Sequence, residues 1–312
     1  MSTHIEQVPA IATVEQTAGP LRRRGGGPMV TEGGGFVFNA FSHGFLLLWA
    51  IMIIFPIGWV VLGGFKDNTE IATSAWSWPA QFRWDNFVRA WTKAGIGEYL
   101  LNTLIVLVPS VLLTMLLGAM AAYVLARYEF PGNRALYYMF LAGTMFPVYL
   151  ALVPLFFVVK NLGMLNTFQG LVLVYIAYSL PFTVFFLHSF FRTLPTAIAE
   201  AGFIDGCGHL GLFFRIMLPM AKPGLISVGI FNVLGQWNQF LLPITLMQPQ
   251  GPGDPQRYVL AQGLADLAVS QGYAADWPAL FAGMTIAMVP VLVVYLSFQR
   301  QVQAGLTAGT LK

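Results

Sequence analysis

Six long apolar stretches alternate with shorter polar segments along the chain, and each is long enough to cross a bilayer. They cover about residues 41–65, 99–125, 135–159, 168–190, 223–247 and 280–299. A helix needs about 20 mostly apolar residues to span roughly 30 Å of hydrocarbon. Prolines inside several stretches fit a bundle in which neighbouring helices satisfy the freed backbone carbonyls. The pattern therefore predicts an all-α integral membrane protein with six transmembrane helices within residues 36–312.

The first 35 residues have a different pattern, with almost no apolar periodicity. Arg22, Arg23 and Arg24 precede three glycines, and a second glycine run occupies 33–35. Such a segment buries too little surface to offset the entropy of ordering it. Residues 1–35 are therefore expected to be a disordered tail whose arginines help to fix topology, with binding to anionic lipid as the alternative.

Composition and charge agree with a membrane setting. Of the 312 residues 57% are apolar and 9% are charged, whereas soluble domains carry about a quarter charged residues. With the N-terminus inside, ten of the sixteen lysines and arginines fall on the inner side, as the positive-inside rule favours. We expect a multi-pass membrane protein with both termini cytoplasmic. A net charge of +3 is too small to indicate a nucleic-acid partner.

The loop between the fourth and fifth stretches, residues 191–222, has the most informative pattern. Pro195 and Thr196 favour the start of a short helix that continues to Ile204, and Gly206 with Gly208 favours its end. A second amphipathic piece follows over 209–218. This pattern suits a surface that docks on another protein, and an ordinary surface loop is the alternative.

Short motifs in this loop resemble a known family. Glu200-Ala201-Gly202, then Ile204-Asp205-Gly206, then Ile216-Met217-Leu218-Pro219 resembles the EAA loop of binding-protein-dependent ABC transporter permeases, in their carbohydrate-uptake branch. Gly202 departs from the usual alanine. The C-terminal segment from Gln299, with Gly305 and Gly309, is similar to the closing segment of maltose-type subunits with six spans. The resemblance runs from about residue 41 to the end.

The resemblance implies the ABC type I importer permease fold with a cytoplasmic coupling helix, at Glu200–Gly208. That helix would insert into a cleft of a separate ATPase, with Glu200 pairing with a basic group and Gly206 ending the helix. The tail over 305–312 would contact the same partner. The residues expected in ATPase coupling are Glu200, Ala201, Gly202, Asp205, Gly206, Pro219, Gly305 and Gly309.

The same resemblance implies the location, which is the prokaryotic cell (inner) membrane, together with the partners and the activity. A second permease subunit, two ATPase subunits and an extracytoplasmic solute-binding protein would complete an ATP-driven importer of a sugar or oligosaccharide. Glycerol-phosphate or another polar solute is the alternative within the family.

Motifs for covalent chemistry are missing from the sequence. None of the five lysines follows a glycine, so the chain has no phosphate loop. Cys207 and His209 could form a weak metal-binding pair. The alternative is that Cys207 is simply a small residue and His209 a solvated imidazole. We therefore expect no cofactor, no metal site and no enzyme activity. The rival class is a self-contained secondary transporter or membrane-embedded enzyme, which usually places ionisable groups inside its spans. The six stretches hold such groups only near their ends.

Uncharged polar residues mark a candidate solute path. Asn232, Gln236 and Gln239 fall within about 60° of one another on a helix, which suits a solute rich in hydroxyl groups. Hydrogen bonds between helices are the alternative. Tyr175 and Tyr178 lie on one side of the fourth stretch, where their rings would stack on a sugar or pack against apolar neighbours.

Two further patterns concern packing and the bilayer surface. Thr103, Ser110, Thr114 and Gly118 form one small-residue face of the second stretch, which predicts close helix packing. The segment 66–98 contains Trp76, Trp78, Trp84 and Trp91, and most of these are expected to form an interfacial aromatic belt.

Overall fold

The computed structural model describes residues 36–270 and 276–308, and these form helices joined by loops, with no β-strand among them. The chain divides within its first helix into two compact units, residues 1–54 and residues 55–312. The elements are α1 (Phe36–Gly63), α2 (Asn68–Thr73), α3 (Asp85–Thr92), α4 (Ile96–Arg127), α5 (Asn133–Met145), the 3-10 helix η1 (Val148–Ala151), α6 (Leu152–Asn161), α7 (Phe168–Thr193), α8 (Thr196–Ile204), α9 (His209–Leu212), the π-helical turn η2 (Phe213–Met217), α10 (Leu218–Met220), α11 (Lys222–Trp237), α12 (Leu241–Leu246), α13 (Leu260–Ser270) and α14 (Trp277–Ala308).

The first unit contributes the N-terminal part of α1, and its side chains are exposed. Leu46, Leu47 and Leu48 are all more than 60% exposed, and Phe45 stacks on Trp49 with ring centroids 6.3 Å apart. An apolar helix without a buried face needs an apolar environment, which lipid or another membrane protein supplies.

Among the residues that the structure describes, four helices are long and apolar enough to cross a membrane: Asn39–Gly63, α4, α7 and Trp277–Gln301. Two bent pairs of helices raise the number of candidate spans to six when each pair is counted as one span. The pairs are Asn133–Met145 with Tyr149–Asn161, bent by 88°, and His209–Met220 with Lys222–Trp237, bent by 77°. Four of the six stretches of the sequence thus correspond to continuous helices and the third to the first bent pair, whereas the second bent pair overlaps the fifth stretch only in Lys222–Trp237.

The apolar run over 135–159 predicts a single helix for the third stretch, and this prediction is wrong. α5 ends at Met145, and Phe146 and Pro147 take extended backbone conformations, with ψ of 124° and 98°. The ring of a proline disfavours the helical conformation in the preceding residue, so Pro147 explains why Phe146 leaves the helix. The chain then resumes in η1 and α6 at a steep angle to α5.

The fifth stretch is also interrupted. α11 ends at Trp237 and α12 begins at Leu241, so one helix does not extend over 223–247. A continuous helix would require Pro243 to donate a backbone hydrogen bond to Gln239, and proline has no N–H to do so. Pro243 lies instead in the first turn of α12, where that loss costs little.

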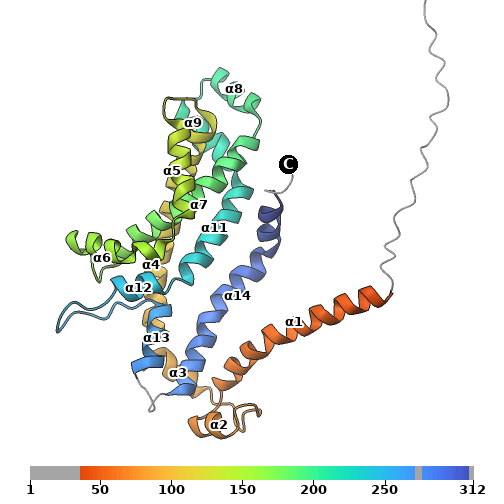
Figure 1. The fold of residues 1–312 in the computed structure, drawn as a ribbon, viewed down its shortest axis with the longest axis vertical. Coiled ribbons are helices and arrows are strands. Elements are labelled where there is room, and N and C mark those ends of the chain that lie inside the picture. The colour runs from red at the N-terminus through yellow and green to blue at the C-terminus, as the bar shows by residue number, and fades with distance from the viewer. Residues whose placement is uncertain (1–35, 271–275, 309–312) are drawn as a thin grey trace, which may run out of the picture. The chain divides into compact units, whose positions relative to one another are not determined.

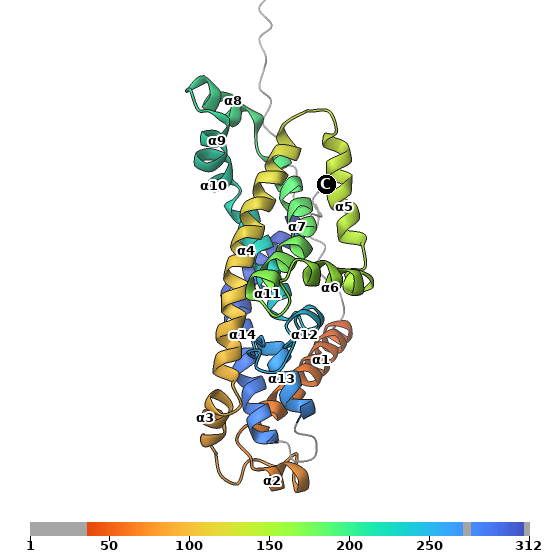
Figure 2. The ribbon, with the colours of Figure 1, turned by 90° about the vertical axis from the view of Figure 1, so that its left-hand side faces the viewer.

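The core of the second unit is built around α4 and α7, which pack along most of their lengths (Figure 2). The small-residue face of α4 lies in this contact: Ser110, Thr114 and Gly118 are buried. A Cβ added at Gly118 would come within 2.5 Å of Thr183 Cγ2, so the two helices approach too closely there for any larger residue. The predicted close packing is confirmed.

The two ends of the second unit carry different short helices. α8 and α9 lie at one end, beyond the end of α7, while α2 and α3 lie at the other end, near the start of α14 (Figure 1). The loop that resembles the EAA motif is therefore separated from the tryptophan-rich segment by the length of the helical bundle.

Candidate functional site

The start and end of α8 are set by Pro195 before the helix and by Gly206 after it. Pro195 occupies the N-cap position with an extended backbone, and the helix runs over Thr196–Ile204, the range that the sequence predicts. Gly206 has φ of +83°, a conformation that residues with a Cβ adopt only at a cost. Its N–H bonds Phe203 O at 3.0 Å, and Cys207 N–H bonds Gly202 O at 2.9 Å. These are the two bonds of a Schellman motif.

α8 is seated on the segment that follows it. Gly202 is buried, and a Cβ at this position would lie 2.8 Å from Leu212 Cδ1 and 3.1 Å from Ile216 Cδ1. The glycine that departs from the family pattern therefore permits close contact between α8 and the α9–η2 segment. In this protein its effect is on packing as well as on the flexibility of the helix.

The opposite side of α8 faces outward. Glu200, Ala201, Asp205 and Gly206 are exposed, and the ion pairs among residues 36–270 and 276–308 do not include either carboxylate. Apolar side chains are exposed around them, with Ile204 86% and Leu210 68% exposed. A helix that presents free carboxylates beside uncovered apolar groups has the composition of a protein-docking surface.

The remaining predicted coupling residues lie elsewhere. Pro219 is exposed in α10, close in sequence to the return into α11. Gly305 lies within α14, whereas Gly309 falls outside the described residues. The structure therefore groups Glu200–Gly206 on one helix and leaves the C-terminal positions separate from it in sequence.

Asn232 and Gln236 tie three helices together inside the subunit. Gln236 accepts a hydrogen bond from Ser110 on α4 and donates one of 3.0 Å to Ser179 on α7. One turn away, Asn232 donates to Thr183 at 2.9 Å. Both side chains are at most 5% exposed. In this conformation the geometry of these two residues favours interhelical hydrogen bonding over contact with a solute.

Three of the predicted path residues do line a common cavity. Tyr175, Gln236 and Gln239 border it together with residues of α4 and of the segment 259–261. Its volume is about 10 Å³, roughly the least space that holds one water molecule. The cavity is far too small for a sugar unless the helices around it separate. Tyr178, one turn further along α7, does not border this cavity and is 39% exposed.

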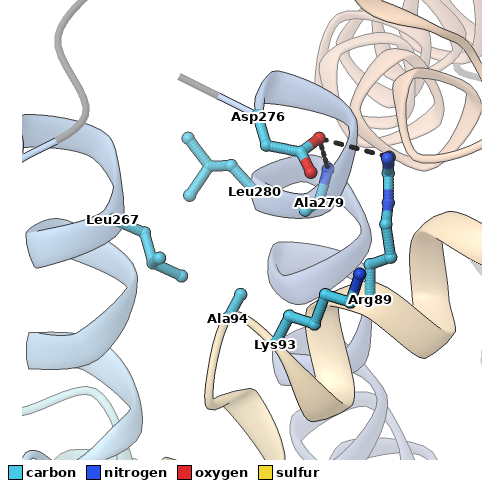
Figure 3. Close-up of a pocket in the computed structure, with 7 residues that line it drawn as sticks. All are labelled: Arg89, Lys93, Ala94, Leu267, Asp276, Ala279 and Leu280. Carbon is cyan, nitrogen blue, oxygen red and sulfur yellow. Dashed lines mark hydrogen bonds and ion pairs between the residues drawn. The ribbon is translucent and has the colours of Figure 1, made fainter. Parts of the chain in front are cut away.

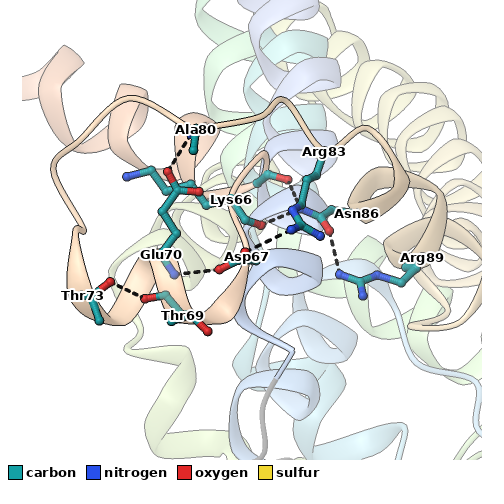
Figure 4. A network of polar contacts seen from close by, with 10 residues as sticks. Lys66, Asp67, Thr69, Glu70, Thr73, Ala80, Arg83, Asn86 and Arg89 are labelled. Atoms are coloured by element: carbon teal, nitrogen blue, oxygen red, sulfur yellow. Dashed lines mark hydrogen bonds and ion pairs between the residues drawn. The ribbon is translucent and has the colours of Figure 1, made fainter.

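At the other end of the bundle, a polar network holds the loop that follows α1 (Figure 4). Lys66 is 1% exposed, and its Nζ donates to Ser74 O at 2.9 Å and to Ala75 O at 3.0 Å. Asp67 caps α2 through Glu70 N–H at 2.7 Å and pairs with Arg83 at 3.1 Å.

This rigid loop displays aromatic rings to its surroundings. Trp76, Trp78 and Trp84 are 67–75% exposed. Trp76 stacks on Phe55, near the end of α1, with ring centroids 5.1 Å apart. The aromatic belt that the sequence predicts stays a prediction, since no bilayer is present, but the exposed rings suit it.

A polar hollow lies close to this loop, between α3, α13 and α14 (Figure 3). It measures about 100 Å³ and is bordered by Arg89, Lys93 and Asp276 with apolar residues opposite. Arg89 is 3.3 Å from Asp276 and donates to Asn86 Oδ1 at 2.7 Å. The hollow thus brings two cations and one carboxylate to the surface beside α3.

Comparison with known proteins decides the family. A model described as binding-protein-dependent transport system inner membrane component matches residues 99–307. The chain belongs to this family. The permease is accordingly a multi-pass membrane component of a transport system and not an enzyme, as the sequence predicts.

Two relatives extend the likeness over most of the permease. It is 52% identical over 275 residues to the diacetylchitobiose uptake system permease protein NgcG of Streptomyces coelicolor, covering 88% of this chain and 89% of that one. It is 35% identical over 268 residues to the probable ABC transporter permease protein YurM of Bacillus subtilis, covering 86% and 87%.

A solved structure shows the same fold. The permease superposes on a chain from a bacterial ABC transporter involved in the import of the acidic polysaccharide alginate with a TM-score of 0.73. The match covers 85% of this chain and 96% of that one at 17% identity. The predicted type I importer permease fold is confirmed.

The permease also contains contacts that its sequence does not reveal. Tyr128, the residue after α4, has its hydroxyl 2.8 Å from His209 Nδ1. The sequence suggests only a weak metal pair for His209, and no group of three potential metal ligands occurs among the described residues. Lys66 is another such case, because nothing in a loop sequence separates a buried lysine from an exposed one.

Proposed function

We propose that the permease is one of two membrane subunits of an ATP-driven importer for a sugar or short oligosaccharide, and that α8 couples it to a separate ATPase. The observation that carries this proposal is α8 itself. It is a helix with a defined end, packed on one side against α9 and η2, with Glu200 and Asp205 free on the other. Two ATPase subunits would each receive one such helix.

The exposed groups of α8 suggest how docking would work. Ile204 and Leu210 would lose water-exposed apolar area on contact, which stabilises the contact. Glu200 would pair with a basic group of the ATPase and set the register of the helix in its cleft. The C-terminal residues from Gly305, including Gly309, would contact the same partner.

The printed names of relatives support a carbohydrate as the solute. NgcG is named as a permease protein for diacetylchitobiose. AraQ of Halalkalibacterium halodurans, 31% identical, is named for arabinooligosaccharides. The side chains at the small cavity support the same class, because Tyr175 and Gln239 offer uncharged donors and acceptors to hydroxyl groups.

The solute would pass only when the helices change their arrangement. ATP binding would draw the ATPases together, move α8, and shift the permease between inward-facing and outward-facing states. Tyr178, on the exposed face of α7, would then meet the solute at the junction with the second permease subunit. Opening of the cavity at Gln239 and Tyr175 would add polar contacts.

The opposite end would receive the solute from an extracytoplasmic binding protein. The hollow beside Arg89 and Lys93 and the exposed rings of Trp78 and Trp84 suit a protein contact. This arrangement requires α8 and both termini to be cytoplasmic, as the distribution of lysine and arginine favours.

The proposal is tested by purifying the tagged permease from its host in mild detergent and identifying the proteins that accompany it. A nucleotide-binding ATPase and a second permease-like chain are expected. The complex is then reconstituted in vesicles with its binding protein, and uptake of labelled diacetylchitobiose, trehalose and glycerol-phosphate is measured with and without ATP. Glu200→Lys is expected to abolish ATP-driven uptake, while Glu129→Lys, which alters an exposed glutamate after α4, leaves it intact.

Two results would overturn the proposal. Recovery of the permease alone from several detergents would contradict the proposed association with a separate ATPase. Uptake driven by an ion gradient in the absence of ATP would indicate a self-contained secondary transporter. Uptake of glycerol-phosphate but of neither sugar would keep the ATP-driven importer and change the solute class.

A further inference from the structure

A continuous set of rings links the far end of α8 to the core of the bundle. Phe203 on α8 meets His209 edge to face, with ring centroids 5.2 Å apart. His209 in turn meets the ring of Tyr128 at 5.5 Å. Tyr128 contacts Tyr123 on α4 at 5.7 Å, and Tyr123 contacts Phe191 on α7 at 5.5 Å.

One bond in this set fixes direction as well as distance. The hydroxyl of Tyr128 and Nδ1 of His209 are 2.8 Å apart, a normal hydrogen-bond length. The bond joins positions 81 residues apart in sequence, one directly after α4 and the other at the start of α9. Edge-to-face rings tolerate sliding, whereas a hydrogen bond weakens steeply with angle.

Both ends of α8 are held at the C-terminal end of α4, by the neighbouring residues Arg127 and Tyr128. Before its start, Leu194 O accepts a hydrogen bond from Arg127, the last residue of α4. Beyond its end, the chain reaches His209 through the left-handed Gly206. The start of α8 is therefore pinned to α4, and a force on α8 would swing its far end, which carries Phe203 and is followed by His209 at the start of α9.

The route along the chain from α8 to α11 is poorly suited to pass on such a swing. It runs through the π-helical turn η2 and then through a 77° bend between His209–Met220 and Lys222–Trp237. A π turn disrupts the regular backbone ladder and is often found where a helix deforms. The cross-link through Tyr128 avoids both features and reaches α4, which packs closely on α7.

We propose that the Tyr128–His209 hydrogen bond is the link that transmits movement of α8 to the α4–α7 pair. His209 and Tyr128 act as positioning residues: neither touches the solute or the nucleotide. The inference rests on the proposed function, since it assumes that an ATPase moves α8.

The test measures coupling and not only activity. The reconstituted complex with its binding protein carries Tyr128→Phe, which keeps the ring and removes the hydroxyl, or His209→Leu, which removes the hydrogen-bonding nitrogen. The readout is labelled diacetylchitobiose taken up per ATP hydrolysed, together with the amount of ATPase bound to the permease. Tyr138→Phe is the matched control, because Tyr138 is 61% exposed on α5 and outside the ring set.

The expected result is uncoupling. Uptake per ATP falls at least fivefold in Tyr128→Phe and His209→Leu, while ATP hydrolysis and bound ATPase stay within twofold of the wild type. The double variant behaves like either single one, as expected for two residues that act through one bond. His209→Asn, whose amide offers a polar atom near the place of Nδ1, restores coupling in part.

Other results would overturn the link. If uptake and hydrolysis fall together with the amount of folded complex, the bond only stabilises the loop. If Tyr128→Phe leaves uptake per ATP unchanged, α8 acts through another route. The wild-type complex is read first: a wild type that neither binds an ATPase nor uses ATP contradicts the proposed function, whereas a coupled wild type with unaffected variants contradicts the link alone.

Discussion

At the scale of single residues, Gly206 shows how one backbone conformation defines the surface offered by α8. Its positive φ lets the chain reverse directly after Asp205, so that Phe203 O and Gly202 O both find donors. Without that reversal the helix would continue or fray, and Glu200 would lose its fixed distance from the helix end.

We predict that Gly206→Ala weakens the association with the ATPase. An alanine in the left-handed region costs about 1 kcal/mol, which would be expressed in this loop as fraying of the last turn of α8. The measurement is the amount of ATPase retained on the tagged permease. Gly208→Ala is the control, because Gly208 has φ of −71° and open space around it; an equal loss in both variants would contradict the role of the conformation.

Lys66 holds the α2 loop, residues 67–84, through hydrogen bonds from its side chain. Its ammonium group lies among backbone carbonyls at the end of α2 and is closed off from solvent. Hydrogen bonds from a charged group contribute about 1.5–3 kcal/mol, more than most contacts in an exposed loop.

We therefore expect Lys66→Met to lower the thermal stability of the purified permease and to expose the loop 67–84 to chymotrypsin. The methionine fills similar space but leaves Ser74 O and Ala75 O without their donor. Unfolding temperature and cleavage pattern check this, with Lys93→Met, at an exposed lysine of the same end, as the control. Identical cleavage in both variants would mean that the loop holds its shape without Lys66.

At the scale of elements, small and polar residues join α4, α7 and α11 beside the apolar side chains of the core. Ser110, Ser179 and Gln236 share one set of hydrogen bonds, and Gly118 removes the side chain that would keep α7 away from α4. In lipid such contacts provide what the hydrophobic effect provides in water.

Gln236→Leu is predicted to lower the free energy of unfolding by about 1 kcal/mol, because it removes two interhelical bonds while Ser110 can still donate to Leu107 O. Uptake per folded complex should hardly change. Both quantities are measured beside Asn238→Leu, which alters an exposed amide one residue after α11. Loss of uptake at unchanged stability would instead place Gln236 on the solute path.

The limits of α8 could be predicted from sequence because they depend on local chemistry, on Pro195 before the start and on Gly206 after the end. The breaks at Phe146 and after Trp237 could not. Pro109 and Pro181 lie inside unbroken helices, whereas Pro147 and Pro243 accompany breaks. Which proline interrupts a helix depends on neighbouring helices: the ring of Pro181, for instance, packs against Gly143 on α5.

The candidate site was predictable to a similar degree. The motif locates α8 and names the residues expected in coupling, because both depend on a short stretch of sequence. The partners of Asn232 and Gln236, and the bond between Tyr128 and His209, come from segments far apart in sequence. Such contacts are set by the fold and leave no periodic signal.

At the scale of the whole molecule, the chain has surfaces that a single copy in water would not leave open. Most residues of α1 from Asn39 to Ile54 are exposed, and Met145 and Leu150 at the bend after α5 are 80% and 76% exposed. Lipid or another membrane protein is the surrounding that these apolar surfaces require.

The orientation of the chain can be checked through its single cysteine. In vesicles that hold the permease without its partners, a membrane-impermeant thiol reagent is expected to label Cys207 only when the cytoplasmic side faces out. In a Cys207→Ser background, Ala80→Cys in the α2 loop should label only from the other side. Labelling of Cys207 from the extracytoplasmic side would invert the topology and remove α8 from the reach of an ATPase.

The hydrogen bonds of Asn232 and Gln236 also limit how the solute specificity of this permease can change. We expect substitutions at these two positions to lower the stability of the helical bundle before they alter solute selectivity. Such variants would be lost because too little folded protein remains. A library that seeks a new sugar should leave both amides unchanged and diversify Tyr178, whose ring is 39% exposed. Natural divergence among permeases for different glycans would follow the same course. The exposed face of α7 would change earlier than Ser179 and Thr183, which bond the two amides.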